Sequence, residues 1–198
     1  MPVEVVSYMM AERNASRRLQ FQLALQCGPF LKGMKKGSIT NIERQDLKEL
    51  WKILAGTGIA FRVLAAHKGK YLILFYRRRE MEEHLNRPDI LEFLEGYDYK
   101  SGRFEELLAH LALRVRQHSC EGIGFPHEIG VFLDYPLEDV TSFIQMGGKH
   151  SLLTGYWKVY HNPEQARMTF LAYDKARYSA VNEFLAGRTI QDIAGRTA

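Results

Sequence analysis

The chain has 198 residues, 46% of them apolar and 25% charged, and it includes 10 Tyr, 11 Phe and 2 Trp. This composition excludes a disordered chain, which would be polar and poor in aromatic residues, and the length suits one hydrophobic core rather than two. The formal charge of +4 is modest for this length, so charge alone does not predict a nucleic-acid-binding protein.

The amino-terminal sequence and the cysteine content point to the cytoplasm. Residues 1–16 lack the cationic and apolar regions of a signal peptide. The most apolar stretch, residues 71–76, is far shorter than the roughly 20 residues that a membrane-spanning helix requires. Cys27 and Cys120 are too few for a disulfide framework. We therefore expect a cytoplasmic protein with no membrane partner.

Two helices are predicted in the first third of the chain. Apolar residues at every fourth position predict a helix over residues 16–27, which the Gly-Pro pair at 28–29 would end. A loop rich in glycine and lysine would follow over residues 30–38. Thr40, with Glu43 three residues later, has the spacing of a capping box and predicts the start of a second helix.

This second helix would end at Gly56, and a hairpin is predicted after it. Residues 59–65 and 70–76 are rich in β-branched and aromatic side chains. The short polar connector at 67–69 is typical of a hairpin turn.

Helices dominate the remainder of the chain. Proline disfavours helical geometry in the residue before it, so Pro88 separates two short predicted helices. The clearest apolar stripe predicts a helix over residues 104–118. The elements predicted in this part are helices over 80–85, 88–94 and 104–118, a strand over 129–133, a helix from Pro136 to the Gly147–Gly148 pair, a strand over 156–160, a long helix over 162–186 and a last turn over 189–194.

The order of these elements does not alternate as in a doubly wound sheet. We predict a single α+β domain over residues 1–198, in which helices cover a small, mostly antiparallel sheet. Residues 1–15 are expected to form a flexible amino-terminal segment.

The standard catalytic and cofactor signatures are absent from the sequence. There is no phosphate-binding loop, no dinucleotide fingerprint, no C-x-x-C pair and no nucleophile elbow. His127-Glu128 begins like a zinc-protease motif, but Val131 stands where the second zinc ligand belongs. A three-ligand set of Cys27, Cys120 and His127 would need the fold to unite distant residues. We predict no metal, and the sequence indicates no particular cofactor.

Residues 27–37 are the first candidate site. Glycines let a backbone approach a ligand closely, and Lys32 and Lys35 would supply positive charge for an anion. The alternative is a surface loop behind a buried structural thiol, because Cys27 continues the apolar face of the helix before it.

His127 and Glu128 are the second candidate site, with the residue types of general acid–base catalysis. Neighbours in a strand point to opposite faces, however, and the alternative is a histidine that is hydrogen-bonded within the fold.

The third candidate site is a strand over residues 156–160. Tyr156, Lys158 and Tyr160 would share one face, which would suit a planar anionic ligand. A core Trp157 beneath an exposed polar face explains the same pattern.

At these segments the chain resembles an uncharacterised bacterial family, domain-of-unknown-function family 3793, which is associated with anaerobes. The resemblance rests on C-x-P-x-L-x-G-x-K-x-G at 27–37, FPHEIGVFLDYPLEDV at 125–140 and GYWKVY at 155–160. The family has glycine where this chain has Asp134, so the turn there is expected to differ. The resemblance implies a bacterial cytosolic protein and supplies no activity.

Three functions remain open. The leading hypothesis is a domain that binds a small anionic or planar ligand, whether or not it acts on that ligand, with His127 and Lys158 on the wall of one pocket. The second is a non-catalytic interaction or regulatory protein in iron or redox handling. The third is weak nucleic-acid binding through basic residues at 32–36 and 77–79. The sequence does not indicate whether the protein is an enzyme or how it oligomerises.

Overall fold

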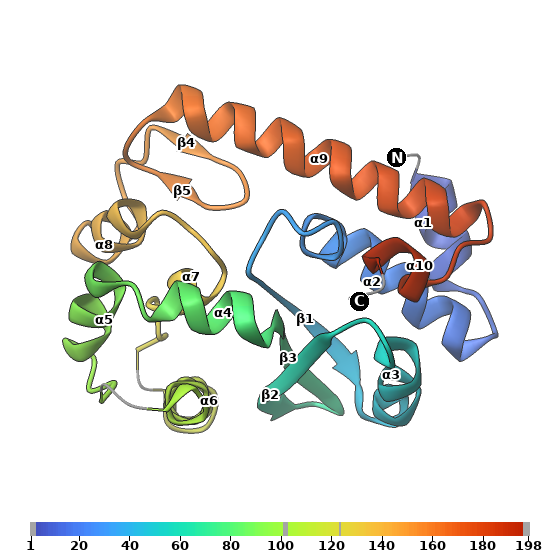
Figure 1. The fold of residues 1–198 in the computed structure, drawn as a ribbon, viewed down its shortest axis with the longest axis horizontal. Helices are drawn as coiled ribbons and strands as arrows, with labels where there is room; N and C mark the ends of the chain where they lie inside the picture. The colour runs from blue at the N-terminus through green and yellow to red at the C-terminus, as the bar shows by residue number, and fades with distance from the viewer. Residues whose placement is uncertain (1–2, 101–102, 123, 196–198) are drawn as a thin grey trace.

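Helices surround two small antiparallel sheets in the computed structural model, which describes residues 3–100, 103–122 and 124–195 (Figure 1). The described elements are α1 (Val3–Met10), α2 (Ala15–Leu31), β1 (Gly37–Glu43), η1 (Arg44–Asp46), α3 (Leu47–Leu54), β2 (Ile59–His67), β3 (Lys70–Arg77), α4 (Arg78–Leu85), α5 (Pro88–Glu95), α6 (Phe104–Glu121), α7 (Ile129–Phe132), α8 (Leu137–Gln145), β4 (Leu153–Thr154), β5 (Lys158–Val159), α9 (Pro163–Leu185) and α10 (Ile190–Ala194). This confirms the predicted α+β class.

The larger sheet has the strand order β1–β3–β2, with both pairs antiparallel. Its β2–β3 hairpin confirms the predicted one. Lys68 and Gly69 at the turn both have positive φ angles, 45° and 79°, as a two-residue hairpin turn requires.

The predicted helix start at residues 40–43 is wrong, because these residues belong to β1. Thr40 lies opposite Ile73, and Glu43 lies opposite Lys70 and forms an ion pair with it at 3.2 Å. All seven residues of β1 pair with β3, and the hydrogen bonds along that edge outweigh the local signal of a capping box. The helix begins later, at Leu47.

The predicted end of the first helix is also wrong, because α2 continues through Gly28 and Pro29 to Leu31. Gly28 lies where α2 crosses α9: a Cβ atom there would lie 2.7 Å from the Cα of Arg177. The guanidinium of Arg77 donates to the carbonyls of Phe30 and Leu31, at 3.0 and 3.2 Å, and so satisfies the open end of the helix.

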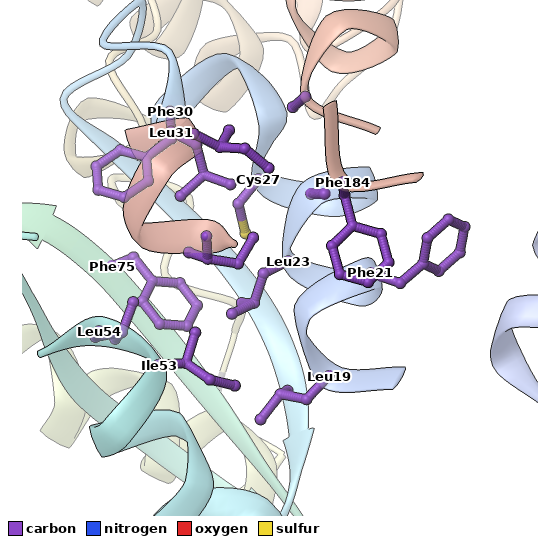
Figure 2. Close-up of a cluster of buried hydrophobic side chains, with 14 of the residues drawn as sticks. Leu19, Phe21, Leu23, Cys27, Phe30, Leu31, Ile53, Leu54, Phe75 and Phe184 are labelled. Carbon is purple, nitrogen blue, oxygen red and sulfur yellow. The ribbon is translucent and has the colours of Figure 1, made fainter. Parts of the chain in front are cut away.

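Two hydrophobic clusters lie on the two faces of the larger sheet. Ile73 and Phe75 of β3 point into the cluster of α2, α3, α9 and α10, whereas Leu74 and Tyr76 point into the cluster formed with α4 to α8. Cys27 lies inside the first cluster (Figure 2). Burial raises the pKa of its thiol to about 11, which fits the structural alternative for this residue.

Residues 129–133 were predicted as a strand, and this is wrong: α7 covers Ile129–Phe132. All four α7 residues are buried, and an apolar run buried on every side does not distinguish a strand from a helix. Asp134 follows with a φ of 61°, a left-handed geometry that glycine and aspartate tolerate better than most residues.

The other predicted helices are confirmed within a few residues, and the predicted strand at 156–160 is reduced to β5, paired with β4. Within residues 1–15, α1 forms a helix whose Met9 side chain is buried. No helix among the described residues is both long and apolar enough to cross a bilayer.

Candidate functional site

The three segments that carry the family resemblance meet around Tyr135. The Nζ atom of Lys35 lies 5.0 Å from the centroid of the Tyr135 ring, and the ring of Trp157 lies 5.4 Å from it on centroids. The backbone N–H of Lys36 donates to Oδ2 of Asp134 at 3.2 Å. Segments distant in the sequence therefore form one contiguous cluster.

A cavity of about 260 Å³ lies beside this cluster, lined by residues of α7, α8, β1 and β5. His127 and Lys158 both line it, as the sequence led us to expect. Apart from these two and Asp139, its walls are apolar or aromatic and include Ile39, Tyr135, Val140, Phe143 and Trp157. An apolar cavity with a few convergent polar groups is the usual form of a small-molecule site.

Lys158 is held in place by Gly148, which follows α8. Its Nζ donates to the carbonyl oxygen of Gly148 at 2.6 Å and lies 5.8 Å from the centroid of the Phe143 ring. An ammonium group carries three donors. One is used by Gly148, so two remain for a ligand in the cavity.

His127 lies exposed at the mouth of the cavity, against the rings of Phe125 and Phe143 at centroid distances of 5.2 and 4.9 Å. Partial desolvation lowers the pKa of His127 below its ordinary value of 6.5, which outweighs the opposite effect of Glu128. The imidazole is therefore neutral at pH 7 and presents one donor and one acceptor.

Asp139 positions the wall that carries Lys158. This buried carboxylate accepts hydrogen bonds from Nε1 of Trp157 at 2.7 Å and from the backbone N–H groups of Tyr160 at 2.7 Å and His161 at 2.9 Å. Asp139 does not stand out in the sequence, because an acidic residue in the first turn of a helix is ordinarily explained by the helix dipole.

Glu128 is not brought together with His127 in the cavity, contrary to the predicted acid–base pair. Its side chain is 1% exposed, and its carboxylate binds Nε of Arg114 and accepts a hydrogen bond from the hydroxyl of Tyr99 at 3.2 Å. His127 and Glu128 are neighbours in the turn before α7, and one side chain is exposed while the other is buried.

The remaining predicted ligand-binding residues also lie outside the lining of this cavity. Lys32 forms an ion pair with Glu183 of α9. The hydroxyl of Tyr156 donates to Asp174 at 3.0 Å, and burial together with this carboxylate raises the pKa of Tyr156 to about 12. Tyr160 is buried and does not line the cavity, and the strand that was to place it beside Tyr156 covers only Lys158–Val159.

Lys35 is buried beneath the aromatic cluster, with 7% of the residue exposed. Its Nζ lies 5.8 Å from the ring centroid of Tyr173, in addition to its contact with Tyr135. Burial lowers the pKa of Lys35 from 10.5 to about 8, although Cys27 and Asp134 favour the charged form. The amine therefore remains mostly protonated at pH 7, as a buried structural charge that lies behind the cavity rather than in it.

Replacing Lys35 with methionine should raise the free energy of unfolding at pH 7 by about 2 kcal/mol. The variant gains roughly 3 kcal/mol because it no longer buries an ammonium charge, and it loses about 1 kcal/mol because the cation–π contacts with the tyrosine rings disappear. Between pH 8 and 10.5 the unfolded chain binds the lysine proton more tightly than the folded protein does. Native stability therefore rises with pH relative to the variant, and the advantage of the variant should disappear by pH 10.5.

Urea denaturation at several pH values measures this difference. Both proteins should carry Cys27→Ala, because Cys27 and Lys35 shift each other's pKa. The exposed Lys175→Met variant controls for the loss of one positive charge. If the difference in the free energy of unfolding between Lys35→Met and the native protein stayed constant with pH, the pKa of Lys35 would not be lowered in the folded protein.

Each arginine of the cluster at 77–79 already has a partner within the fold. Arg77 is buried at the end of α2, Arg78 binds Glu105 at 2.7 Å, and Arg79 binds Glu83 at 2.9 Å. Paired arginines offer less free charge to phosphates. That nucleic-acid binding is weak or absent stays a prediction.

A second, more polar cleft of about 800 Å³ lies between α4, α5 and α8. Its polar groups are largely bonded to one another: Oγ of Ser142 lies 3.0 Å from Nε2 of His161, and Arg87 binds Asp89. Among the described side chains no group of three His, Cys, Asp or Glu could hold a metal ion. The side chain of Cys120 is outside the described part, so the absence of a metal stays a prediction.

Comparison with known proteins identifies a family and nothing further. Residues 23–194 match the profile of a family described as "Protein of unknown function (DUF3793)". No curated protein matches the chain, and no solved structure matches it.

Proposed function

The chain belongs to the DUF3793 family, and because that description carries no activity, we propose its function from the geometry of the cavity: it binds a small, mostly planar ligand that bears one anionic group. The observation that carries this proposal is the position of Lys158 and His127 on the wall of an otherwise apolar and aromatic cavity. The aromatic walls would cover the planar part of the ligand, and Lys158 would bind its anion.

The proposal is for binding rather than catalysis. A general base needs a proton within reach and usually a group that orients it. His127 is neutral and accessible, but Glu128 is committed to Arg114 and Asp139 to three backbone and indole donors. His127 therefore serves the ligand as a hydrogen-bonding group at the mouth. We also propose that the protein acts in the cytoplasm, where its thiols stay reduced.

Two fluorescent probes of similar shape test the proposal. We expect 8-anilinonaphthalene-1-sulfonate, which has a planar naphthalene ring and an anionic sulfonate, to bind the cavity more tightly than the uncharged N-phenyl-1-naphthylamine. The Lys158→Met variant keeps the aliphatic stem and removes the charge. It should weaken binding of the sulfonate by roughly 10- to 100-fold, the worth of one charged hydrogen bond, and change binding of the amine little.

Two controls sharpen the result. Lys149→Met removes an exposed charge close in sequence to the anchor of Lys158 and should leave both affinities unchanged. Val140→Phe places a larger side chain in the cavity wall and should weaken both probes. Equal loss of both probes in Lys158→Met, or no loss of either, would contradict the proposal. Native mass spectrometry of protein purified from its own host would then identify the retained ligand.

A further inference from the structure

The charges around the cavity limit the kind of anion that Lys158 can hold. Among the described residues that line the cavity, Lys158 and Asp139 are the ones ionised at pH 7, and their charges are opposite. They lie at opposite ends of α8: the Nζ atom of Lys158 donates to Gly148, which follows the helix, whereas Asp139 belongs to its first turn. Asp139 therefore adds a negative charge to the wall without pairing with Lys158.

The surroundings of Lys158 oppose a second negative charge on a ligand. The negative end of the α8 dipole lies beside its ammonium group, which it stabilises, and it would repel an anion bound there. The nearby charges already have partners, because Glu128 binds Arg114. The carboxylate of Asp134 likewise favours the charged form of Lys35 behind the cavity. One positive charge is thus the whole provision of the described wall for an anion.

We propose that the cavity selects singly charged anions, so that its ligand is an aromatic monocarboxylate rather than a phosphate monoester such as a nucleotide or a phosphorylated cofactor. This inference rests on the proposed function. The cost of moving an ion out of water rises with the square of its charge, whereas its attraction to one lysine rises only in proportion to the charge. A phosphate monoester, whose second pKa is about 6, must therefore take up a proton before it binds.

Two ligands of the same shape separate the effect of charge from that of fit. 2-Naphthyl sulfate is singly charged at every pH used, whereas 2-naphthyl phosphate is doubly charged above its second pKa. Isothermal titration calorimetry at pH 5, 7 and 8 measures both affinities. Because only the protonated fraction of the phosphate binds, its affinity relative to the sulfate should be about tenfold lower at pH 7 and about a hundredfold lower at pH 8, and nearly equal at pH 5. 2-Naphthoate, the carboxylate, should follow the sulfate.

The titration of His127 is separated from that of the ligand by a variant. Glu128 and His118 both influence this imidazole, and the ring of His118 also packs on Phe125. His127→Gln keeps a donor and an acceptor but does not titrate. The ratio of phosphate to sulfate affinity should change with pH in this variant as in the native protein, because the proton belongs to the ligand. A ratio that no longer changed with pH would place the proton on the histidine and overturn the inference.

A second cation in the wall should relax the selection. Phe125 is 38% exposed and lines the cavity, so Phe125→Lys adds a positive charge at the mouth. This variant should reduce the difference between sulfate and phosphate at pH 8 by about tenfold, the worth of one charged hydrogen bond. Leu113→Lys, at an exposed apolar position of α6 outside the cavity, is the matched control and should leave the difference unchanged.

The two proposals fail in different ways. Phosphate that bound as tightly as the sulfate at pH 8 would overturn the selection of single charges and leave the proposed function intact. Failure of the sulfate, the phosphate and the carboxylate to bind at any of these pH values would overturn both.

Discussion

Replacing Asp139 with alanine should lower the free energy of unfolding by about 3–5 kcal/mol, because each buried donor left without an acceptor costs roughly 1–3 kcal/mol. Three donors depend on this carboxylate: the indole N–H of Trp157 and the backbone N–H groups of Tyr160 and His161. Urea denaturation measures the loss, and near-ultraviolet circular dichroism reports whether Trp157 keeps a fixed environment.

The neighbouring carboxylate of Glu138 provides the matched control. It lies in the same helical turn, is exposed, and accepts one hydrogen bond from Asn162 at 3.3 Å. Glu138→Ala should change the free energy of unfolding by less than about 0.5 kcal/mol. If Asp139→Ala were equally mild, the carboxylate would not be what holds β5 against α8, and the wall that carries Lys158 would have another support.

The elements predicted correctly from the sequence are those whose signal is local. The β2–β3 hairpin combines β-branched strands with a turn at Lys68–Gly69, and α6 has a continuous apolar stripe. The errors occur where a distant partner decides the structure. Residues 40–43 have a helical capping pattern, yet they pair with β3 as a strand. The Gly-Pro pair at Gly28 predicts a helix end, yet the helix continues there because glycine lets α9 approach closely.

The same distinction applies to the candidate site. Lys158 and His127 could be selected from the sequence because each is a polar residue in an aromatic segment. The role of Asp139 could not, because its three donors come from residues that only the tertiary fold places beside α8. Lys35 was predicted to be a ligand-binding group, but the rings of Tyr135 and Tyr173, which lie far along the chain, cover it.

Glu128→Ala should lower the free energy of unfolding by about 2–4 kcal/mol, because it removes a buried carboxylate that accepts from two donors and leaves the partly exposed Arg114 unpaired. The variant leaves the guanidinium of Arg114 without its carboxylate and the hydroxyl of the buried Tyr99 without its acceptor. Burial, with the Glu128 carboxylate beside it, raises the pKa of Tyr99, so this hydroxyl stays protonated and needs an acceptor.

The expected separation of stability from binding makes this prediction informative about function. In folded Glu128→Ala protein, the affinity for 8-anilinonaphthalene-1-sulfonate should stay within about twofold of the native value, because Glu128 does not line the cavity. His127→Ala should weaken probe binding and leave the free energy of unfolding nearly unchanged, because the imidazole is exposed and its loss leaves no buried group unpaired.

A double variant, Arg114→Met with Glu128→Met, should recover much of the stability lost in Glu128→Ala, because replacing both members of the ion pair leaves no charge without a partner. If Glu128→Ala instead abolished probe binding while leaving the free energy of unfolding nearly unchanged, Glu128 would act on the ligand together with His127, and the assignment of its carboxylate to the core would be wrong.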